Sequence, residues 1–98
     1  MELKITWDTL AITQFLNAMA YIENDSPSNA EKVKRQILLK IDALLKHPEI
    51  HRLDKYRLNN DGTFRAFELH RYRVTYCIMR DEIRIVRIRH TKMSPLFY

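Results

Sequence analysis

Four residues in the last third of the sequence have the side-chain types that metal-free RNA cleavage requires: Arg73, His90, Lys92 and Tyr98. Histidine can act as an acid or a base near neutral pH. Arginine and lysine can stabilise the charged transition state, and tyrosine can stack on a base or carry a proton. Three of them also have ordinary structural interpretations: Arg73 as a solvent-facing or acid-paired strand arginine, His90 as a strand-end histidine with a backbone partner, and Tyr98 as a disordered chain end. The four together form a hypothetical ribonuclease site.

Other common active-site chemistries lack the residues that they need. A single glycine excludes the glycine-rich loops that bind nucleotide phosphates, and no Gly-x-Ser-x-Gly motif is present. No His-Glu-x-x-His motif occurs, and the four histidines have no metal-ligand spacing with Cys77. Cys77 is expected to be a small core residue. Because it is the only cysteine in the sequence, an internal disulfide is excluded. The sequence therefore predicts no metal site and no cofactor.

Positive charge is concentrated in the second half of the chain. Residues 1–50 hold six Lys and Arg against seven Asp and Glu, whereas residues 51–98 hold eleven against five. Guanidinium groups suit phosphate and carboxylate partners, so a polyanion is indicated, nucleic acid first; many small domains are basic without such a partner. The candidate RNA-backbone contacts, beside the four residues above, are Lys55, Arg57, Arg65, Arg71 and Arg89.

Length and composition predict one globular domain over residues 1–98. The chain is 46% hydrophobic and 30% charged, which supports one core and leaves no room for a second domain. No apolar run approaches the roughly 18 residues of a membrane span. The N-terminus lacks a basic region followed by an apolar one, so no signal peptide is expected. A cytoplasmic protein without membrane contact is predicted.

The first half of the sequence indicates a strand and two helices. Residues 2–6 alternate between polar and apolar, and apolar residues recur at helical spacing over residues 11–22. A break at residues 24–27 precedes a capping box, Ser28–Glu31, that would begin a second helix ending before Pro48. The short break predicts an antiparallel helical hairpin. The expected buried stripe of the second helix is Ala30, Val33, Ile37, Ile41, Leu44 and Leu45.

The second half indicates three consecutive strands after an aperiodic connector. Residues 47–63, called the connector below, show no clean period and contain the only glycine. Alternation follows over residues 65–69, 72–78 and 83–90, with a tight turn at residues 80–82, which predicts an antiparallel meander. The predicted fold is α+β, in the order β-α-α-β-β-β, with the helical hairpin packed on a small, mainly antiparallel sheet.

Alternation in the middle strand divides its side chains between two faces. Tyr72, Val74, Tyr76 and Ile78 share the face expected to pack on the helices. The other face is expected to be open and lined with unpaired arginines, and it holds Arg71, Arg73, Thr75 and Cys77. Replacement of Arg73 by alanine is therefore expected to leave the fold intact. In the last strand the pattern changes phase between Ile85 and Val86, where a bulge is possible.

Three segments of the sequence resemble the RelE/ParE superfamily of bacterial toxins from type II toxin–antitoxin modules. They are residues 60–68, residues 72–76 and residues 84–92. The resemblance covers nearly the whole chain, and it implies this superfamily's fold, which has the same β-α-α-β-β-β order. It also implies an antitoxin that wraps the toxin, and one of two activities. RelE-like members cleave mRNA in the ribosomal A site without metal, whereas ParE-like members poison DNA gyrase with no known chemistry of their own.

The resemblance assigns expected roles to individual residues. Arg73 matches the strand arginine that contacts the scissile phosphate in RNA-cleaving members, Lys92 lies near their second arginine, and Tyr98 lies near their C-terminal tyrosine. His90 matches a catalytic histidine of some nucleases, but many gyrase-type members also have a histidine there. Two departures weaken the ribonuclease match. The connector has no acid between Asp54 and Asp61, and Lys92 lacks the fork of arginine.

The sequence therefore predicts a toxin with an acidic, partly disordered antitoxin as its partner. The first hypothesis is a ribosome-dependent mRNA endonuclease that acts on the ribosome and mRNA. The alternative is a non-enzymatic inhibitor of DNA gyrase that uses the same basic end of the molecule. A third possibility is a plain nucleic-acid-binding domain, which the shortage of exposed strand aromatics disfavours.

Overall fold

The alternating second half of the chain forms a three-stranded meander, as predicted. The structure is a computed structural model that describes residues 2–98. Strands β2 (Phe64–Leu69), β3 (Tyr72–Ile78) and β4 (Glu82–His90) are antiparallel neighbours. Strand β1 (Lys4–Trp7) pairs in parallel with β4, so the sheet is mixed, in the order β1-β4-β3-β2. The order of the elements along the chain matches the prediction.

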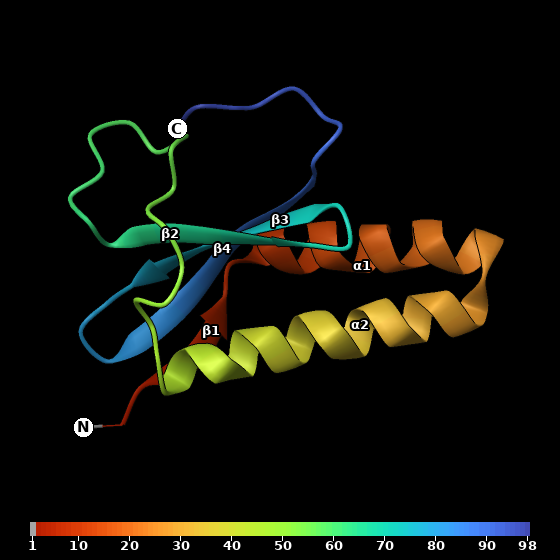
Figure 1. The fold of residues 1–98 in the computed structure, drawn as a ribbon, viewed down its shortest axis with the longest axis horizontal. Coiled ribbons are helices and arrows are strands. Elements are labelled where there is room, and N and C mark those ends of the chain that lie inside the picture. Colours follow the sequence, from red (N-terminus) through yellow and green to blue (C-terminus); the bar gives the residue numbers. More distant parts are fainter. Residues whose placement is uncertain (1) are drawn as a thin grey trace.

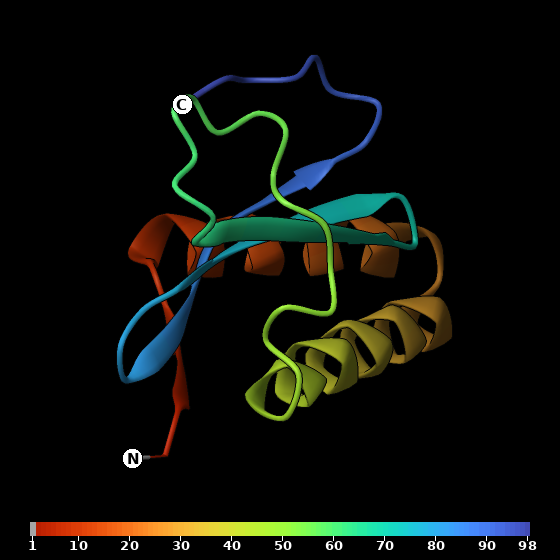
Figure 2. The same cartoon turned by 60° about the vertical axis from the view of Figure 1, so that its left-hand side comes forward.

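Two helices cover one face of this sheet (Figures 1 and 2). Helix α1 (Thr9–Asp25) and helix α2 (Pro27–Asp42) are joined only through Ser26. The Ser26 hydroxyl accepts a hydrogen bond from the Asn29 N–H at 3.2 Å, and Pro27 occupies the first turn, where its missing N–H costs nothing. The predicted capping box at Ser28–Glu31 is therefore wrong: the cap is Ser26, and Ser28 already lies inside α2. Among residues 2–98, no helix is long and apolar enough to cross a bilayer.

The core lies between the helices and the inner face of the sheet. Tyr72, Val74 and Tyr76 are buried there, as the alternation of β3 predicts. The predicted stripe of α2 is buried from Ala30 to Leu44. Leu45 is an exception, 40% exposed, because the chain tightens into a 3₁₀ turn, η1 (Ala43–Leu45), whose three-residue period rotates Leu45 away from the core.

A β-bulge in β4 explains the change of phase in the sequence. Thr75 pairs with Arg87 while the next residue, Tyr76, pairs with Ile85, which leaves Val86 as the extra residue. The predicted bulge is thereby confirmed. It sets Ile88 toward the core beside Val74, and it sets Arg87 and Arg89 on the outer face with Arg73.

The outer face of the sheet is covered, not open. The connector and the C-terminal segment (residues 91–98) meet over the side of the sheet away from the helices (Figures 1 and 2). The Asp54 N–H donates to the Phe64 carbonyl at 2.9 Å, and the Leu58 N–H donates to the Tyr98 carbonyl at 2.7 Å. Thr75, predicted on the open face, is 0% exposed. Cys77 was predicted to be a small core residue. It is instead half-buried on this outer face and does not belong to the core.

The turn between β2 and β3 carries backbone strain that a substitution can relieve. His70 and Arg71 have φ angles of 51° and 68°, a left-handed pair that favours Asn and Gly. We expect Arg71→Gly to raise the free energy of unfolding by about 0.5–1 kcal/mol, because relief of the strain exceeds the entropy cost of glycine. Urea denaturation measures the change. Arg80→Gly in the β3–β4 turn, where φ is negative, is the control and should give no gain; an equal gain there would contradict the explanation.

Candidate functional site

A buried carboxylate, Asp54, organises the outer face. Its side chain is 0% exposed and lies in the connector, above β3. Arg73 Nη2 lies 2.8 Å from Asp54 Oδ1, and the Tyr98 hydroxyl donates to Oδ2. The backbone N–H of Tyr56 donates to Oδ1 at 3.2 Å. One carboxylate thus joins the connector, strand β3 and the C-terminal segment.

The protonation states of this cluster follow from burial and hydrogen bonding. Burial raises the pKa of Asp54, but hydrogen bonds from Tyr98 and Arg73 outweigh it and hold the pKa below the ordinary value. Burial lowers the pKa of Arg73, but the bonds to Asp54 and Glu68 outweigh it, so that pKa is raised. Burial and the bond to Asp54 raise the pKa of Tyr98. At neutral pH the cluster is an ionised pair with a neutral phenol.

Arg73 is a paired arginine, which agrees with its ordinary structural interpretation and contradicts the expectation of unpaired arginines on this face. Besides Asp54, it contacts Glu68 Oε2 at 3.1 Å, and its guanidinium lies 4.9 Å from the Tyr56 ring centre. Its Nε is buried without a hydrogen-bond partner. A phosphate that approached Arg73 would have to compete with two carboxylates that already neutralise its charge.

The other outer-face arginines bind backbone carbonyls or aromatic rings. Arg87 donates to the Leu96 carbonyl at 2.8 Å and stacks on Tyr98 at 4.0 Å. Burial lowers the pKa of Arg87. Among residues 2–98, no carboxylate lies within 4 Å of Arg87, so its charge is not neutralised by a partner.

The predicted RNA-contacting residues are scattered over this side of the molecule. Arg89 donates to the Ser94 carbonyl at 3.0 Å, and Arg65 donates to the His51 carbonyl at 2.7 Å. Arg57 lies 3.9 Å from the centre of the Phe64 ring. Lys55 is exposed beside Tyr56, and Arg71 is exposed in the β2–β3 turn. They do not converge on a single point.

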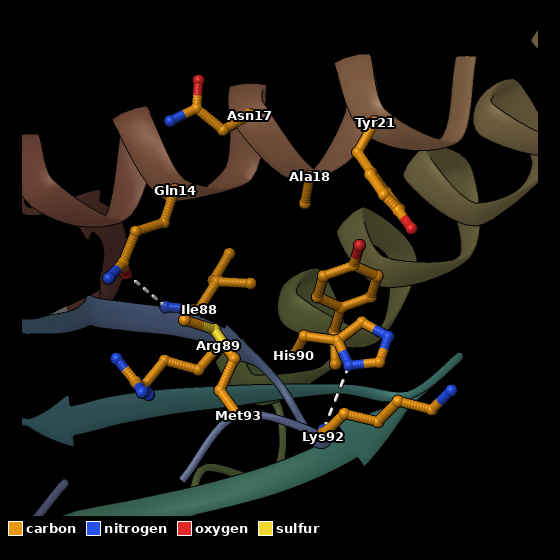
Figure 3. A pocket seen from close by; sticks show the side chains of 10 residues that line it. Gln14, Asn17, Ala18, Tyr21, Ile88, Arg89, His90, Lys92 and Met93 are labelled. Atoms are coloured by element: carbon orange, nitrogen blue, oxygen red, sulfur yellow. Dashed lines mark hydrogen bonds between the residues drawn. The ribbon is translucent and has the colours of Figure 1, made fainter. Parts of the chain in front are cut away.

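The His90 ring lies on the opposite side of the sheet from Arg73, although both residues line a small depression of about 90 Å³. His90 pairs with Tyr72 across the strands and packs against its ring at 5.1 Å. The Lys92 N–H donates to His90 Nδ1 at 3.0 Å, so a neutral His90 ring carries its proton on Nε2. Figure 3 shows the His90 ring on the side of helix α1, whereas the Lys92 side chain extends away from that helix; Gln14 of α1 accepts a hydrogen bond from the Ile88 N–H.

The space between α1 and the end of β4 is a cavity of about 460 Å³. Tyr21 from α1 and His90, Lys92 and Met93 from the end of the sheet line it (Figure 3). None of its lining residues is acidic. The cavity can donate hydrogen bonds to a polar or anionic group, and its titratable side chains besides His90 are Tyr21, Tyr72, Arg89 and Lys92.

The four predicted catalytic residues therefore form two separate pairs. Arg73 and Tyr98 meet at Asp54 on the outer face, whereas the His90 ring accepts a hydrogen bond from the Lys92 backbone, and both residues line the cavity beside α1. Sequence reasoning missed Asp54, whose only signal is an acid placed inside a basic, aperiodic connector. Residues 2–98 contain no group of three His, Cys, Asp or Glu side chains placed to hold a metal ion.

Comparison with known proteins identifies the family. The family model of the ParE toxin of type II toxin–antitoxin system parDE matches residues 5–95. Curated protein sequences give no match. The chain is similar in structure to a chain of the chromosomal ParDE toxin–antitoxin system from P. aeruginosa, with a TM-score of 0.71 and 17% identity over 93% of this chain and 98% of that one. It is also similar to the YoeB dimer from Staphylococcus aureus, with a TM-score of 0.58 and 15% identity over 92% and 98%.

The two structural matches show the fold alone, because the sequence identities of 17% and 15% are too low to carry over function. They agree with the observed arrangement of two helices on a four-stranded mixed sheet, and the predicted RelE/ParE fold is confirmed. The family match covers most of the chain and implies an antitoxin partner. This protein belongs to the ParE toxin family of type II toxin–antitoxin systems.

Proposed function

We propose that this toxin inhibits DNA gyrase without chemistry of its own. The match to the ParE family supports this assignment, because the superfamily resemblance connects ParE-like members with gyrase. The geometric observation that supports it is that the His90 ring packs against Tyr72 on the helix side of the sheet, whereas Arg73 and Tyr98 bind Asp54 on the outer side; Arg73 and His90 share only the lining of a small depression of about 90 Å³. General acid–base catalysis requires its groups within hydrogen-bond reach of one substrate.

An mRNA endonuclease is the second candidate function. It is favoured by one observation, the contact of Arg73 and Tyr98 through Asp54, since the resemblance matches Arg73 to the strand arginine of RNA-cleaving members and places Tyr98 near their C-terminal tyrosine. Against it, Arg73 is neutralised by Asp54 and Glu68. Phosphoryl transfer without metal depends on cations that are free to bind the transition state.

The two functions are separated by measuring supercoiling and mRNA cleavage in parallel. We expect the purified toxin to inhibit gyrase supercoiling, and His90→Ala to change the inhibitory concentration by less than about threefold. Loss of a general acid or base would instead slow RNA cleavage by about 10²–10⁴. His47→Ala, at an exposed connector position, is the matched control. Arg73→Ala is unsuitable here because it disturbs the buried pair.

Mild induction in cells with primer extension on a reporter mRNA completes the test. New cuts within codons that disappear in His90→Ala, together with undisturbed supercoiling, would overturn the proposal and establish the endonuclease. Intact message together with inhibited supercoiling supports the gyrase function. Intact message with undisturbed supercoiling would reject both candidates.

A further inference from the structure

A second cavity, which we call the connector cleft, lies between the end of α2, connector residues 50–55 and strand β2. Its volume is about 490 Å³. Lys40, Arg52 and Lys55 bring positive charge to it, and Ile50, Leu53 and Phe67 bring apolar surface. Neither His90 nor His47, the residues substituted in the supercoiling and mRNA-cleavage test, lines this cleft.

The positive charge of the connector cleft is not neutralised from within. Among residues 2–98, no carboxylate lies within 4 Å of the side-chain nitrogens of Lys40, Arg52 or Lys55. Arg73 and Glu68 also line the cleft but pair with one another. Three cations around one depression attract an anionic partner, and that attraction depends on salt concentration.

The apolar surface of the connector cleft identifies the class of partner. Ile50 is 66% exposed and Leu53 is 49% exposed, although both are aliphatic. Phe67 is only 5% exposed, and His51 covers it with ring centres 4.9 Å apart. Single-stranded nucleic acids bind by stacking bases on exposed rings, which this cleft does not offer. Exposed aliphatic side chains among cations suit a peptide that carries both aliphatic and acidic residues.

The edge of the sheet beside the cleft favours an extended peptide. Strand β2 is an edge strand, and the connector pairs with its first half through the bond from the Ala66 N–H to the Arg52 carbonyl, 3.1 Å. In an antiparallel strand the N–H and C=O groups of every second residue point to the same edge, so those of Glu68, two residues after Ala66, also point away from β3. No backbone partner outside the sheet is found for Glu68 among residues 2–98. An extended segment can continue the pairing there.

We propose that the connector cleft receives an extended, acidic segment of the antitoxin, with an aliphatic side chain seated between Ile50 and Leu53. The segment's carboxylates contact Lys40, Arg52 and Lys55, and its backbone pairs with Glu68. This inference rests on the antitoxin partnership of the family and is independent of the cellular target of the toxin.

The test measures the affinity of the full-length toxin for the protein of the adjacent reading frame, used as the antitoxin. The double variant Arg52→Glu/Lys55→Glu reverses two cleft charges, and we expect at least tenfold weaker binding with a smaller salt dependence. Lys34→Glu/Arg35→Glu makes the same change of net charge on exposed positions of α2 and is expected to weaken binding less than threefold. Ile50→Ser is expected to weaken binding about tenfold, and Leu39→Ser, 63% exposed on α2, is its control.

Equal losses in the cleft and control variants would overturn the proposal, because net charge alone would then explain the effect. Unchanged affinity in Arg52→Glu/Lys55→Glu would also overturn it. A labelled single-stranded oligonucleotide that loses binding in this variant while the antitoxin does not would assign the cleft to nucleic acid instead. Supercoiling assays with the same variant keep the two proposals separate, since gyrase inhibition is expected to persist when antitoxin binding is lost.

Discussion

Asp54→Ala is expected to lower the free energy of unfolding by about 3–5 kcal/mol, which is a large share of the stability of a small domain. The substitution leaves the Arg73 guanidinium partly buried with one exposed partner, and it removes the acceptor of the Tyr98 hydroxyl. Urea denaturation measures the loss. Glu68→Gln removes the exposed partner of Arg73, 53% exposed, and is the control, with an expected cost below about 1 kcal/mol. Equal costs would contradict the central role of Asp54.

The contribution of Asp54 to the free energy of unfolding is expected to decrease as the pH falls into the acid range. The folded-state pKa of Asp54 lies below its ordinary value of 3.8, because hydrogen bonds from Tyr98 and Arg73 outweigh the effect of burial. The contribution is therefore fully present above pH 3.8 and is lost as the pH falls through the lower folded-state pKa. The difference in stability between the wild-type chain and Asp54→Ala is expected to narrow over that acid range.

The same pair corrects the expectation that Arg73→Ala leaves the fold intact. Without Arg73, the Asp54 carboxylate is buried at 0% exposure and retains only the Tyr98 hydroxyl and the Tyr56 N–H as partners. We expect a loss similar to that of Asp54→Ala, about 3–5 kcal/mol. Loss of toxicity in Arg73→Ala would therefore reflect unfolding as readily as a missing contact.

Tyr76→Ala is expected to cost about 3–5 kcal/mol, by removal of a fully buried ring from the core. Tyr76 is 0% exposed, and its hydroxyl donates to the Pro48 carbonyl at 2.7 Å. The residue thus joins the core to the start of the connector. Tyr76→Phe keeps the ring and removes only the hydrogen bond, with an expected cost of about 1 kcal/mol. Denaturant unfolding of both variants separates packing from anchoring, and a similar cost for both would contradict the packing explanation.

Alkaline pH tests the environment of the same hydroxyl. Burial raises the pKa of Tyr76 from 10.0 to about 12. Its contribution to stability is therefore fully present below pH 10 and is lost as the pH rises from 10 to 12. The pKa of Tyr98 is also raised, but Tyr98 is present in both the wild-type chain and Tyr76→Phe, so its titration affects both equally. The wild-type chain is expected to lose more stability over this interval than Tyr76→Phe, and parallel curves would contradict a buried phenol.

The periodic parts of the sequence predicted the helices and the sheet, whereas the aperiodic parts gave no indication that the connector and residues 91–98 cover the outer face. The strands β2, β3 and β4 differ from their predicted bounds by one residue at most, because alternation against a core leaves a strict pattern. The connector and residues 91–98 have no period, so their position over the outer face could not be derived from spacing. The cap of α2 was misplaced because Ser26 and Ser28 are both good caps, and only the position of Pro27 distinguishes them.

The candidate site shows the same division. Alternation correctly separated Arg73 from Tyr72, and the bulge correctly signalled an irregularity near Val86. The partners of Arg73 could not be foreseen, because Asp54 is 19 residues away and reaches it only through the path of the connector. Long-range pairs of this kind follow from the course of a loop, which local sequence does not encode.

The bulge at Val86 has a consequence for reading other members of the family. Because Thr75 pairs with Arg87 and Tyr76 with Ile85, deletion of Val86 would join two stretches of regular ladder without moving any other side chain to a new face. An insertion between Arg87 and Ile88, by contrast, would send Ile88 outward and Arg89 toward the core. Alignments of relatives are therefore expected to place their one-residue gap in this strand at Val86, and a gap at another position of the strand would mark a misaligned sequence.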